Sequence, residues 1–146
     1  MRADLGFYIK RLRNNLERIS YQYYDSAGHG EYSLMNLWIV DYLYDNRDRQ
    51  VFPRDIEEEF FITRATVSKM LNLMEEKGLI ARRKMAEDGR LKQILLLPAG
   101  EALRQDAQKI RSQIEERITR NLSEEEQGQF RDLCRKILKG MEETQG

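Results

Sequence analysis

A run of basic side chains between Arg82 and Gln93 has the residue types needed to bind an anionic partner. The stretch reads RRKMAEDGRLKQ, so three arginines and two lysines stand against Glu87 and Asp88. Guanidinium and ammonium groups bind phosphate oxygens well, and arginine offers them a two-pronged contact. Aspartate followed by Gly89 is also typical of a tight hairpin turn, because glycine adopts positive φ without steric cost. We therefore expect a two-stranded β ribbon at this place.

Arg90 is expected at the tip of that ribbon. An arginine presented in this way suits the minor groove of DNA, whose negative potential deepens where the groove narrows. Asp88 is expected to hold the guanidinium by a bidentate contact and to fix its direction. The alternative is a solvent-exposed Asp and Arg pair that flanks a glycine turn and stabilises the fold little.

The distribution of charge points to the same region. The chain has 25 basic and 25 acidic residues, but the segment from Phe61 to Leu97 has eight basic and four acidic ones. The segments on either side are mildly acidic. A basic island of this kind favours phosphate contact with salt-dependent affinity. An ordinary solvated surface is the alternative that charge alone leaves open.

The elements that must position these residues are two short helices before the ribbon. Pro53 favours the first turn of a helix from Pro53 to about Phe60, and Thr63 is a suitable N-cap for a helix from Arg64 to about Lys77. The joint Phe60-Phe61-Ile62 between them predicts a helix-turn-helix. The apolar runs 79–81 and 93–96 then supply the two strands, which makes the ribbon a wing.

The second short helix separates an apolar face from a polar one. Val67, Met70, Leu71 and Met74 share one side, which turns Ala65, Ser68, Lys69 and Asn72 outward. A recognition helix needs small or polar side chains near its start, where they can approach base edges in the major groove. An ordinary surface helix is the alternative.

Long amphipathic helices are expected at both ends of the chain. The first carries Leu5, Ile9, Leu12, Leu16, Ile19 and Tyr23 in steps of four and three, and SAGHG ends it. Ser33 is expected to cap a helix from Leu34 to about Tyr44. After Pro98 one stripe holds Leu103, Ala107, Ile110, Ile114, Ile118 and Leu122. A capping box, SEEE, starts a last helix with Phe130, Leu133, Cys134, Ile137, Leu138 and Met141 on one face.

These terminal helices predict packing on one another and on a second copy of the chain. One cysteine and one histidine exclude an intrachain disulfide and disfavour a Cys/His zinc site. We expect no cofactor and no metal. We also expect no membrane span and a cytoplasmic location. The glutamate runs suit helix starts rather than a paired acid and base, so we expect no enzymatic activity.

The run from Asp55 to Gly100 resembles the DNA-binding core of the MarR family of bacterial winged helix-turn-helix regulators. The family's wing signature is Asp-x-Arg with a Leu-Thr pair further on; here Asp88 and Arg90 match it, and LKQILL follows up to Leu96, with Leu97 in the threonine place. Phe61 stands where the family commonly has a small residue, and Glu57 where it often has alanine. The resemblance implies a mainly α fold with a small two- or three-stranded β wing. It also implies homodimerisation through 1–30 and 98–146, with 31–97 as the winged DNA-binding region.

We therefore expect a homodimeric transcriptional regulator, most readily a repressor, that binds a pseudo-palindromic operator in double-stranded DNA. A winged-helix module used only for protein assembly is the rival. The expected DNA-binding residues are Thr63, Arg64, Ala65, Thr66, Ser68, Lys69, Asn72, Arg82, Arg83, Lys84, Asp88, Gly89, Arg90 and Lys92.

The resemblance also implies a small-molecule switch. Aromatic residues that could line an effector crevice are Tyr8, Tyr21, Tyr24, Trp38 and Tyr42, with Phe61 beside them. At helical spacing such residues are more often core, so both interpretations stay open. Cys134 is expected to be a small buried apolar residue rather than an oxidation sensor.

Overall fold

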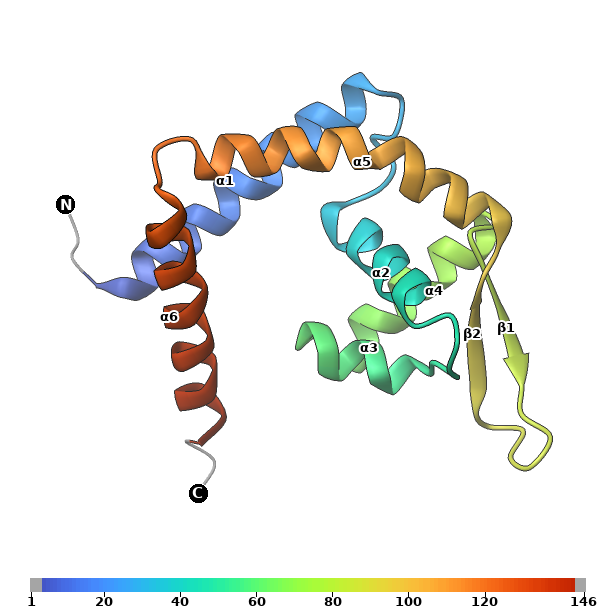
Figure 1. Ribbon diagram of the computed structural model, residues 1–146. Coiled ribbons are helices and arrows are strands. Elements are labelled where there is room, and N and C mark those ends of the chain that lie inside the picture. Colours follow the sequence, from blue (N-terminus) through green and yellow to red (C-terminus); the bar gives the residue numbers. More distant parts are fainter. Residues whose placement is uncertain (1–3, 144–146) are drawn as a thin grey trace. The chain divides into compact units, whose positions relative to one another are not determined.

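The computed structural model describes residues 4–143, which form six helices and one two-stranded sheet (Figure 1). In chain order they are α1 Leu5–Ser26, α2 Leu34–Asp45, α3 Pro53–Phe60, α4 Arg64–Glu76, β1 Ile80–Lys84, β2 Lys92–Leu96, α5 Pro98–Thr119 and α6 Glu124–Glu142. The predicted fold class, mainly α with a small β wing, is confirmed.

Side-chain caps fix where the helices begin. The Ser33 and Ser123 hydroxyls accept hydrogen bonds from the third backbone N–H of their helices. In return, the backbone N–H of Ser33 donates to Oδ1 of Asn36 at 2.8 Å, and that of Ser123 donates to Oε1 of Glu126 at 2.9 Å. Each arrangement satisfies two otherwise unpaired backbone donors. The predicted starts at Ser33, Thr63 and Ser123 are confirmed.

The wing is an antiparallel pair whose register runs from Ile80 opposite Leu96 to Lys84 opposite Lys92. Both strands extend further toward the tip than their apolar runs predict, because the backbone pairing continues through charged, exposed positions. The N–H of Ile94 also donates to the carbonyl of Val51 at 2.8 Å. This one backbone bond links the segment before α3 to β2, and the sheet in residues 4–143 has two strands.

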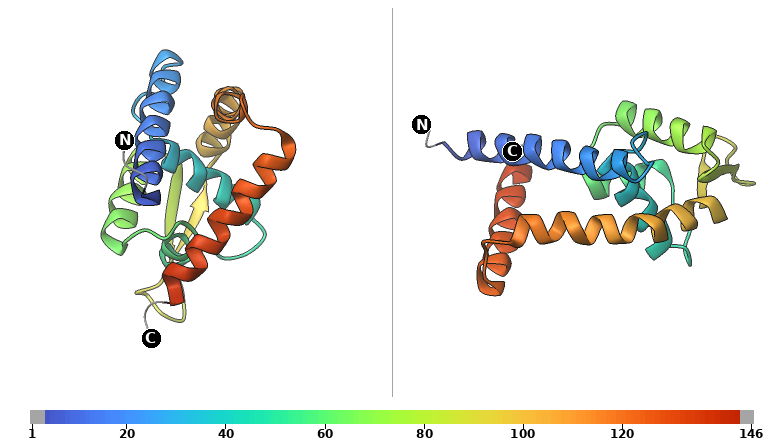
Figure 2. Two further views of the ribbon diagram at one scale, coloured as in Figure 1. Left: turned by 90° about the vertical axis from the view of Figure 1, so that its left-hand side faces the viewer. Right: turned by 90° about the horizontal axis from the view of Figure 1, so that it is seen from above.

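The chain divides into two compact units, with the boundary after Ile110 inside α5. In the unit that ends there, α3 and α4 pack on each other, α2 and α3 contact β2, and α4 contacts β1 (Figure 2). The side chains that fill this core are fully buried; they include Leu37, Ile39, Val40, Ile56, Val67, Leu71, Met74 and Ile80. Burial of these apolar side chains stabilises the helix-turn-helix on which the polar surface is carried.

Helix α5 approaches the root of the wing closely at Gly100. A Cβ added there would lie 2.5 Å from the carbonyl oxygen of Leu79 and 2.5 Å from Cδ1 of Leu96. The backbone N–H of Leu97 also donates to that same Leu79 carbonyl, at 2.9 Å. Glycine is therefore required at this contact, and it fixes the start of α5 against both strands.

An ion pair joins α2 to α5 in the same unit. Nε of Arg104 lies 3.2 Å from Oδ1 of Asp41, and the two side chains are only 20% and 16% exposed. The guanidinium carbon also lies 3.9 Å above the centre of the Tyr44 ring. The pair is thus largely removed from water, which makes each partner dependent on the other.

The second unit contains the end of α5 and the whole of α6. The predicted apolar face of α6 is present, but Phe130, Leu133, Leu138 and Met141 are each more than half exposed. Cys134, predicted to be buried there, is only half-buried. The α5 stripe is buried at Leu103, Ala107, Ile110 and Ile114, whereas Ile118 and Leu122 are exposed.

Helix α1 likewise leaves Leu5, Ile9 and Leu12 exposed. None of the helices in residues 4–143 is both long and apolar enough to cross a membrane.

Candidate nucleic-acid interface

Helix α4 presents the polar face that its sequence predicts. Val67, Leu71 and Met74 are buried, and the residues opposite them are exposed: Arg64, Ala65, Ser68, Lys69 and Asn72. The hydroxyl of Thr63 accepts from the N–H of Thr66 at 3.2 Å, and the two threonine hydroxyls lie 2.9 Å apart. Thr66, one of the expected DNA-binding residues, is thus half-buried and engaged in the cap.

The turn between α3 and α4 has an unusual residue at its first position. Phe61 caps α3 with φ 53° and ψ 52°, the left-handed region, and its N–H donates to the carbonyl of Glu57. Its side chain is 75% exposed. The expectation that Phe61 lines an effector crevice stays a prediction, and in this single chain the ring is mostly exposed to solvent.

Arg82 joins the wing to α4. Its Nη2 donates to Oδ1 of Asn72 at 2.7 Å and to Oε1 of Glu75 at 2.9 Å, while its Nε donates to Oε2 of Glu75 at 3.3 Å. The Arg82 side chain is only 21% exposed. Its hydrogen bond holds the pKa of the Glu75 carboxyl below its usual value. Arg82 thus fixes the wing to the helix rather than standing free for a phosphate.

Arg83 is held by a contact across the wing. Its Nη2 donates to Oε1 of Gln93, the residue opposite it in the strand pair, at 2.8 Å. Lys84 and Lys92 form the next pair and are exposed. Two like charges placed opposite each other repel, which is unfavourable unless an anion lies between or beside them.

The tip of the wing differs from the tight turn that the sequence predicts. Met85 N–H donates to the Leu91 carbonyl and Leu91 N–H to the Asp88 carbonyl, so the loop is longer than two residues. Gly89 does not have positive φ; among the described residues only Gly28, Gly78 and Phe61 do. The longer loop relieves the chain of the twist that a two-residue turn requires, so Gly89 needs no special backbone conformation.

Asp88 fixes Arg90 through one oxygen rather than two. Oδ1 accepts from the backbone N–H of Arg90 at 3.0 Å and from its Nε at 3.3 Å. The expected bidentate contact is thus wrong in detail, because the guanidinium of Arg90 donates to Asp88 through Nε and not through its two terminal nitrogens. The Arg90 side chain is 93% exposed.

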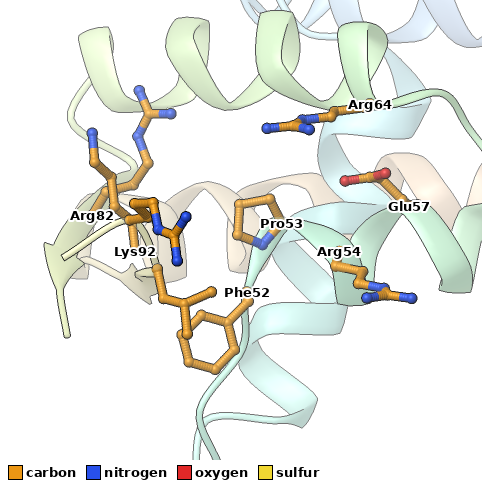
Figure 3. A pocket seen from close by; sticks show the side chains of 9 residues that line it. Phe52, Pro53, Arg54, Glu57, Arg64, Arg82 and Lys92 are labelled. Carbon is orange, nitrogen blue, oxygen red and sulfur yellow. The ribbon is translucent and has the colours of Figure 1, made fainter. Parts of the chain in front are cut away.

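An open cleft of about 440 Å³ lies between the wing and the starts of α3 and α4 (Figure 3). Five cationic side chains line it, together with Phe52, Pro53, Leu91 and a single acid, Glu57: Arg54, Arg64, Arg82, Arg90 and Lys92. The geometry brings four of the predicted residues, Arg64, Arg82, Arg90 and Lys92, around one basic hollow. Sequence reasoning missed Arg54, which the first turn of a helix-turn-helix could have indicated.

The other aromatic candidates do not gather around this cleft. Tyr24 is fully buried in the core, whereas Tyr8, Tyr21 and Trp38 are partly exposed. The Tyr42 hydroxyl accepts from Nη2 of Arg49 at 2.6 Å, and its ring meets Phe60 edge to face. An effector crevice at these residues stays a prediction. Within residues 4–143, no cluster of three or more His, Cys, Asp or Glu side chains could hold a metal ion.

A two-helix motif, a polar recognition-type face and a β ribbon with an exposed arginine define a winged helix-turn-helix protein. Known structures of this fold are similar over almost the whole chain. MepR from S. aureus, solved in complex with DNA, has a TM-score of 0.84 at 24% identity, with 95% of this chain and 99% of MepR covered. MarR from E. coli in its reduced form has a TM-score of 0.71 at 17% identity, with 94% and 98% covered.

Residues 32–91 match the model of the MarR family. The match lies within the winged helix-turn-helix region of the chain. A curated relative, the transcriptional regulator HosA from Escherichia coli O127:H6, is 37% identical over 76 residues. That match takes in 52% of this chain and 56% of HosA, so the chain spans little more than half the length of this relative.

Proposed function

We propose that the chain is a sequence-specific DNA-binding transcriptional regulator that acts as a homodimer. The observation that carries the proposal is Arg90, a 93% exposed arginine directed by Asp88 at the end of a ribbon that Arg82 fixes to α4. Helix α4 would enter the major groove with Ala65, Ser68 and Lys69 toward the base edges, and Arg90 would enter the adjacent minor groove.

Phosphate contacts would hold the protein on the duplex. The exposed cations suited to that task are Arg64, Lys84 and Lys92, with Arg54 added from α3. Arg82 and Arg83 are engaged within the chain, so they would act mainly by holding the wing in place. Phosphate contacts would make the affinity for DNA fall with rising salt concentration, while base contacts would determine which DNA sequence is bound.

The exposed apolar faces of α1 and α6 support a homodimer. Leu12 on α1 and Leu133 and Leu138 on α6 are each more than half exposed, which is costly for a chain that stays alone. A symmetric dimer would bind a pseudo-palindromic operator, with half-sites about one helical turn apart. Occupation of such a site would most simply block transcription, so we propose a repressor.

Selection of bound duplexes from a random pool by the purified protein tests this function. We expect recovery of an inverted repeat, and failure to enrich any sequence would reject the proposal in favour of a module used only for protein assembly. On the selected duplex, Arg90→Ala should weaken binding by about 1 to 3 kcal/mol. Arg135→Ala is a matched control, since Arg135 also pairs with a nearby aspartate, Asp132, but lies on α6.

Control by a small molecule is a further part of the proposal. The BpsR structure from Bordetella bronchiseptica, whose subject is regulation of DNA binding by 6-hydroxynicotinic acid, has a TM-score of 0.82 at 20% identity, with 92% of each chain covered. The aromatic residues around Tyr24 and Trp38 are the proposed place for an effector here. Release of the selected duplex by a small aromatic acid, lost on Trp38→Ala, would test it.

A further inference from the structure

Phe61 adopts a backbone conformation that does not suit a phenylalanine. Its φ of 53° is the only positive value at a residue other than glycine within 4–143. A Cβ in this region crowds the following carbonyl oxygen, so bulky residues avoid it and glycine is favoured. The fold would therefore be at least as stable with glycine at position 61.

The ring of Phe61 does not offset that strain by packing inside the unit. The side chain is 75% exposed, whereas Ile56, on the α3 face that packs into the core, is fully buried. The next residue, Ile62, is half-buried. Strain of this kind at an exposed residue is a reason to look for a function outside the fold.

Phe61 lies close to the N-terminus of α4, the end of the helix that is proposed to contact the bases. Phe61 ends α3, and Thr63, two residues on, caps α4. Its Cα therefore lies within about 7 Å of the cap residue's Cα. If α4 enters the major groove by its N-terminus, the turn lies at the rim of that groove, beside Arg64.

We propose that Phe61 is a DNA-contacting residue that packs its ring on an apolar part of the duplex at the outer edge of each half-site. The apolar surfaces available there are the deoxyribose and the 5-methyl group of thymine, and phenylalanine is suited to both. This inference rests on the proposed function. It assigns to the turn a contact that adds affinity without adding charge.

The experiment compares Phe61→Gly and Phe61→Asn with Phe61→Tyr on the selected duplex. Glycine and asparagine tolerate the left-handed backbone but lack the ring, whereas tyrosine keeps it. We expect Phe61→Gly and Phe61→Asn to raise Kd about five- to tenfold, in proportion to the ring area buried, and Phe61→Tyr to change it less than about twofold. Urea unfolding midpoints of the glycine and asparagine variants should be unchanged or higher.

The salt dependence separates an apolar contact from a charged one. The slope of log Kd against log salt should be the same for Phe61→Gly as for the parent protein, because no phosphate contact is lost. Replacing single thymines of the half-site by uracil then identifies the surface. A methyl contact predicts one position where uracil weakens the parent protein and not Phe61→Gly, and a sugar contact predicts no such position.

Equal affinity of Phe61→Gly and the parent protein would overturn the inference. So would an equal loss in Phe61→Tyr, or a loss of affinity that accompanies a lower unfolding midpoint or a dissociated dimer. If the parent protein itself enriches no duplex, the proposed function fails instead, and the two failures are thereby distinguished.

Discussion

Removing Arg82 should separate the wing from α4 without removing a phosphate contact. Three hydrogen bonds of 2.7, 2.9 and 3.3 Å join its guanidinium to Asn72 and Glu75. A solvent-exposed ion pair contributes about 0.2 to 1 kcal/mol, and a hydrogen bond to a charged group about 1.5 to 3 kcal/mol. Since Arg82 is 21% and Glu75 43% exposed, we place the coupling between them near the upper limit of the first range.

A double-mutant cycle measures that coupling. Urea unfolding of Arg82→Ala, Glu75→Ala and the double variant should give a coupling of about 1 kcal/mol, with Arg82→Ala alone costing somewhat more because its aliphatic stem is also lost. A coupling below about 0.3 kcal/mol would refute the reasoning, since the two hydrogen bonds between Arg82 and Glu75 would then contribute nothing beyond solvation.

The same variants distinguish positioning from phosphate binding. Arg82→Lys keeps the charge but cannot reach Asn72 and both oxygens of Glu75 together, so we expect it to weaken DNA binding nearly as much as Arg82→Ala. The salt slope should stay close to the parent value in Arg82→Ala, whereas Arg64→Ala should reduce it by about 1. A reduction of about 1 in Arg82→Ala would show that Arg82 contacts a phosphate, as its sequence position suggested.

Acid should weaken the same contact. The hydrogen bond from Arg82 lowers the pKa of Glu75 in the folded protein. Its contribution to stability is therefore fully present above the ordinary glutamate pKa of about 4.3 and is lost as the pH falls through the lower folded value. Glu75→Gln should remove that part of the acid sensitivity, and an unchanged pH profile of the unfolding midpoint would contradict the assignment.

Three further predictions concern stability and can be measured by urea unfolding. Gly100→Ala should cost about 2 to 3 kcal/mol, because its Cβ would lie 2.5 Å from a backbone oxygen, whereas Gly128→Ala in α6, with nothing within 4 Å, should be neutral or stabilising. Asp41→Asn should cost about 2 kcal/mol by leaving Arg104 largely buried without its counter-charge, and a neutral result would show that water reaches the pair. Ser123→Ala should cost about 1 kcal/mol through loss of the α6 cap, with a matching loss of helical circular dichroism.

The elements were predictable where a local signal decides them. Ser33, Thr63 and Ser123 each carry a hydroxyl that competes for backbone N–H groups, and a helix begins after each one. The same logic failed at Gly89, since the pairing of β1 and β2, a property of two distant segments, determines how long the loop between them is.

The site was predictable by residue type but not by partner. The spacing of apolar residues along α4 correctly predicted that Ala65 and Ser68 are exposed. It could not show that Arg82 faces Glu75, because the direction in which a wing folds over a helix depends on tertiary packing. The strain at Phe61 was equally hidden, since phenylalanine itself gives no sign of a positive φ.

The single backbone bond between Val51 and Ile94 has a mechanical consequence for the tip of the wing. Arg90 stands four residues from Ile94, at most about 14 Å along an extended chain, so a tilt of about 5° at that bond would move it by up to about 1.2 Å. That displacement is about 40% of the length of a hydrogen bond. The accuracy with which Arg90 is aimed is therefore decided where the strands leave the body of the protein, at Val51, Leu79 and Gly100, and a change there would act on the tip through leverage alone.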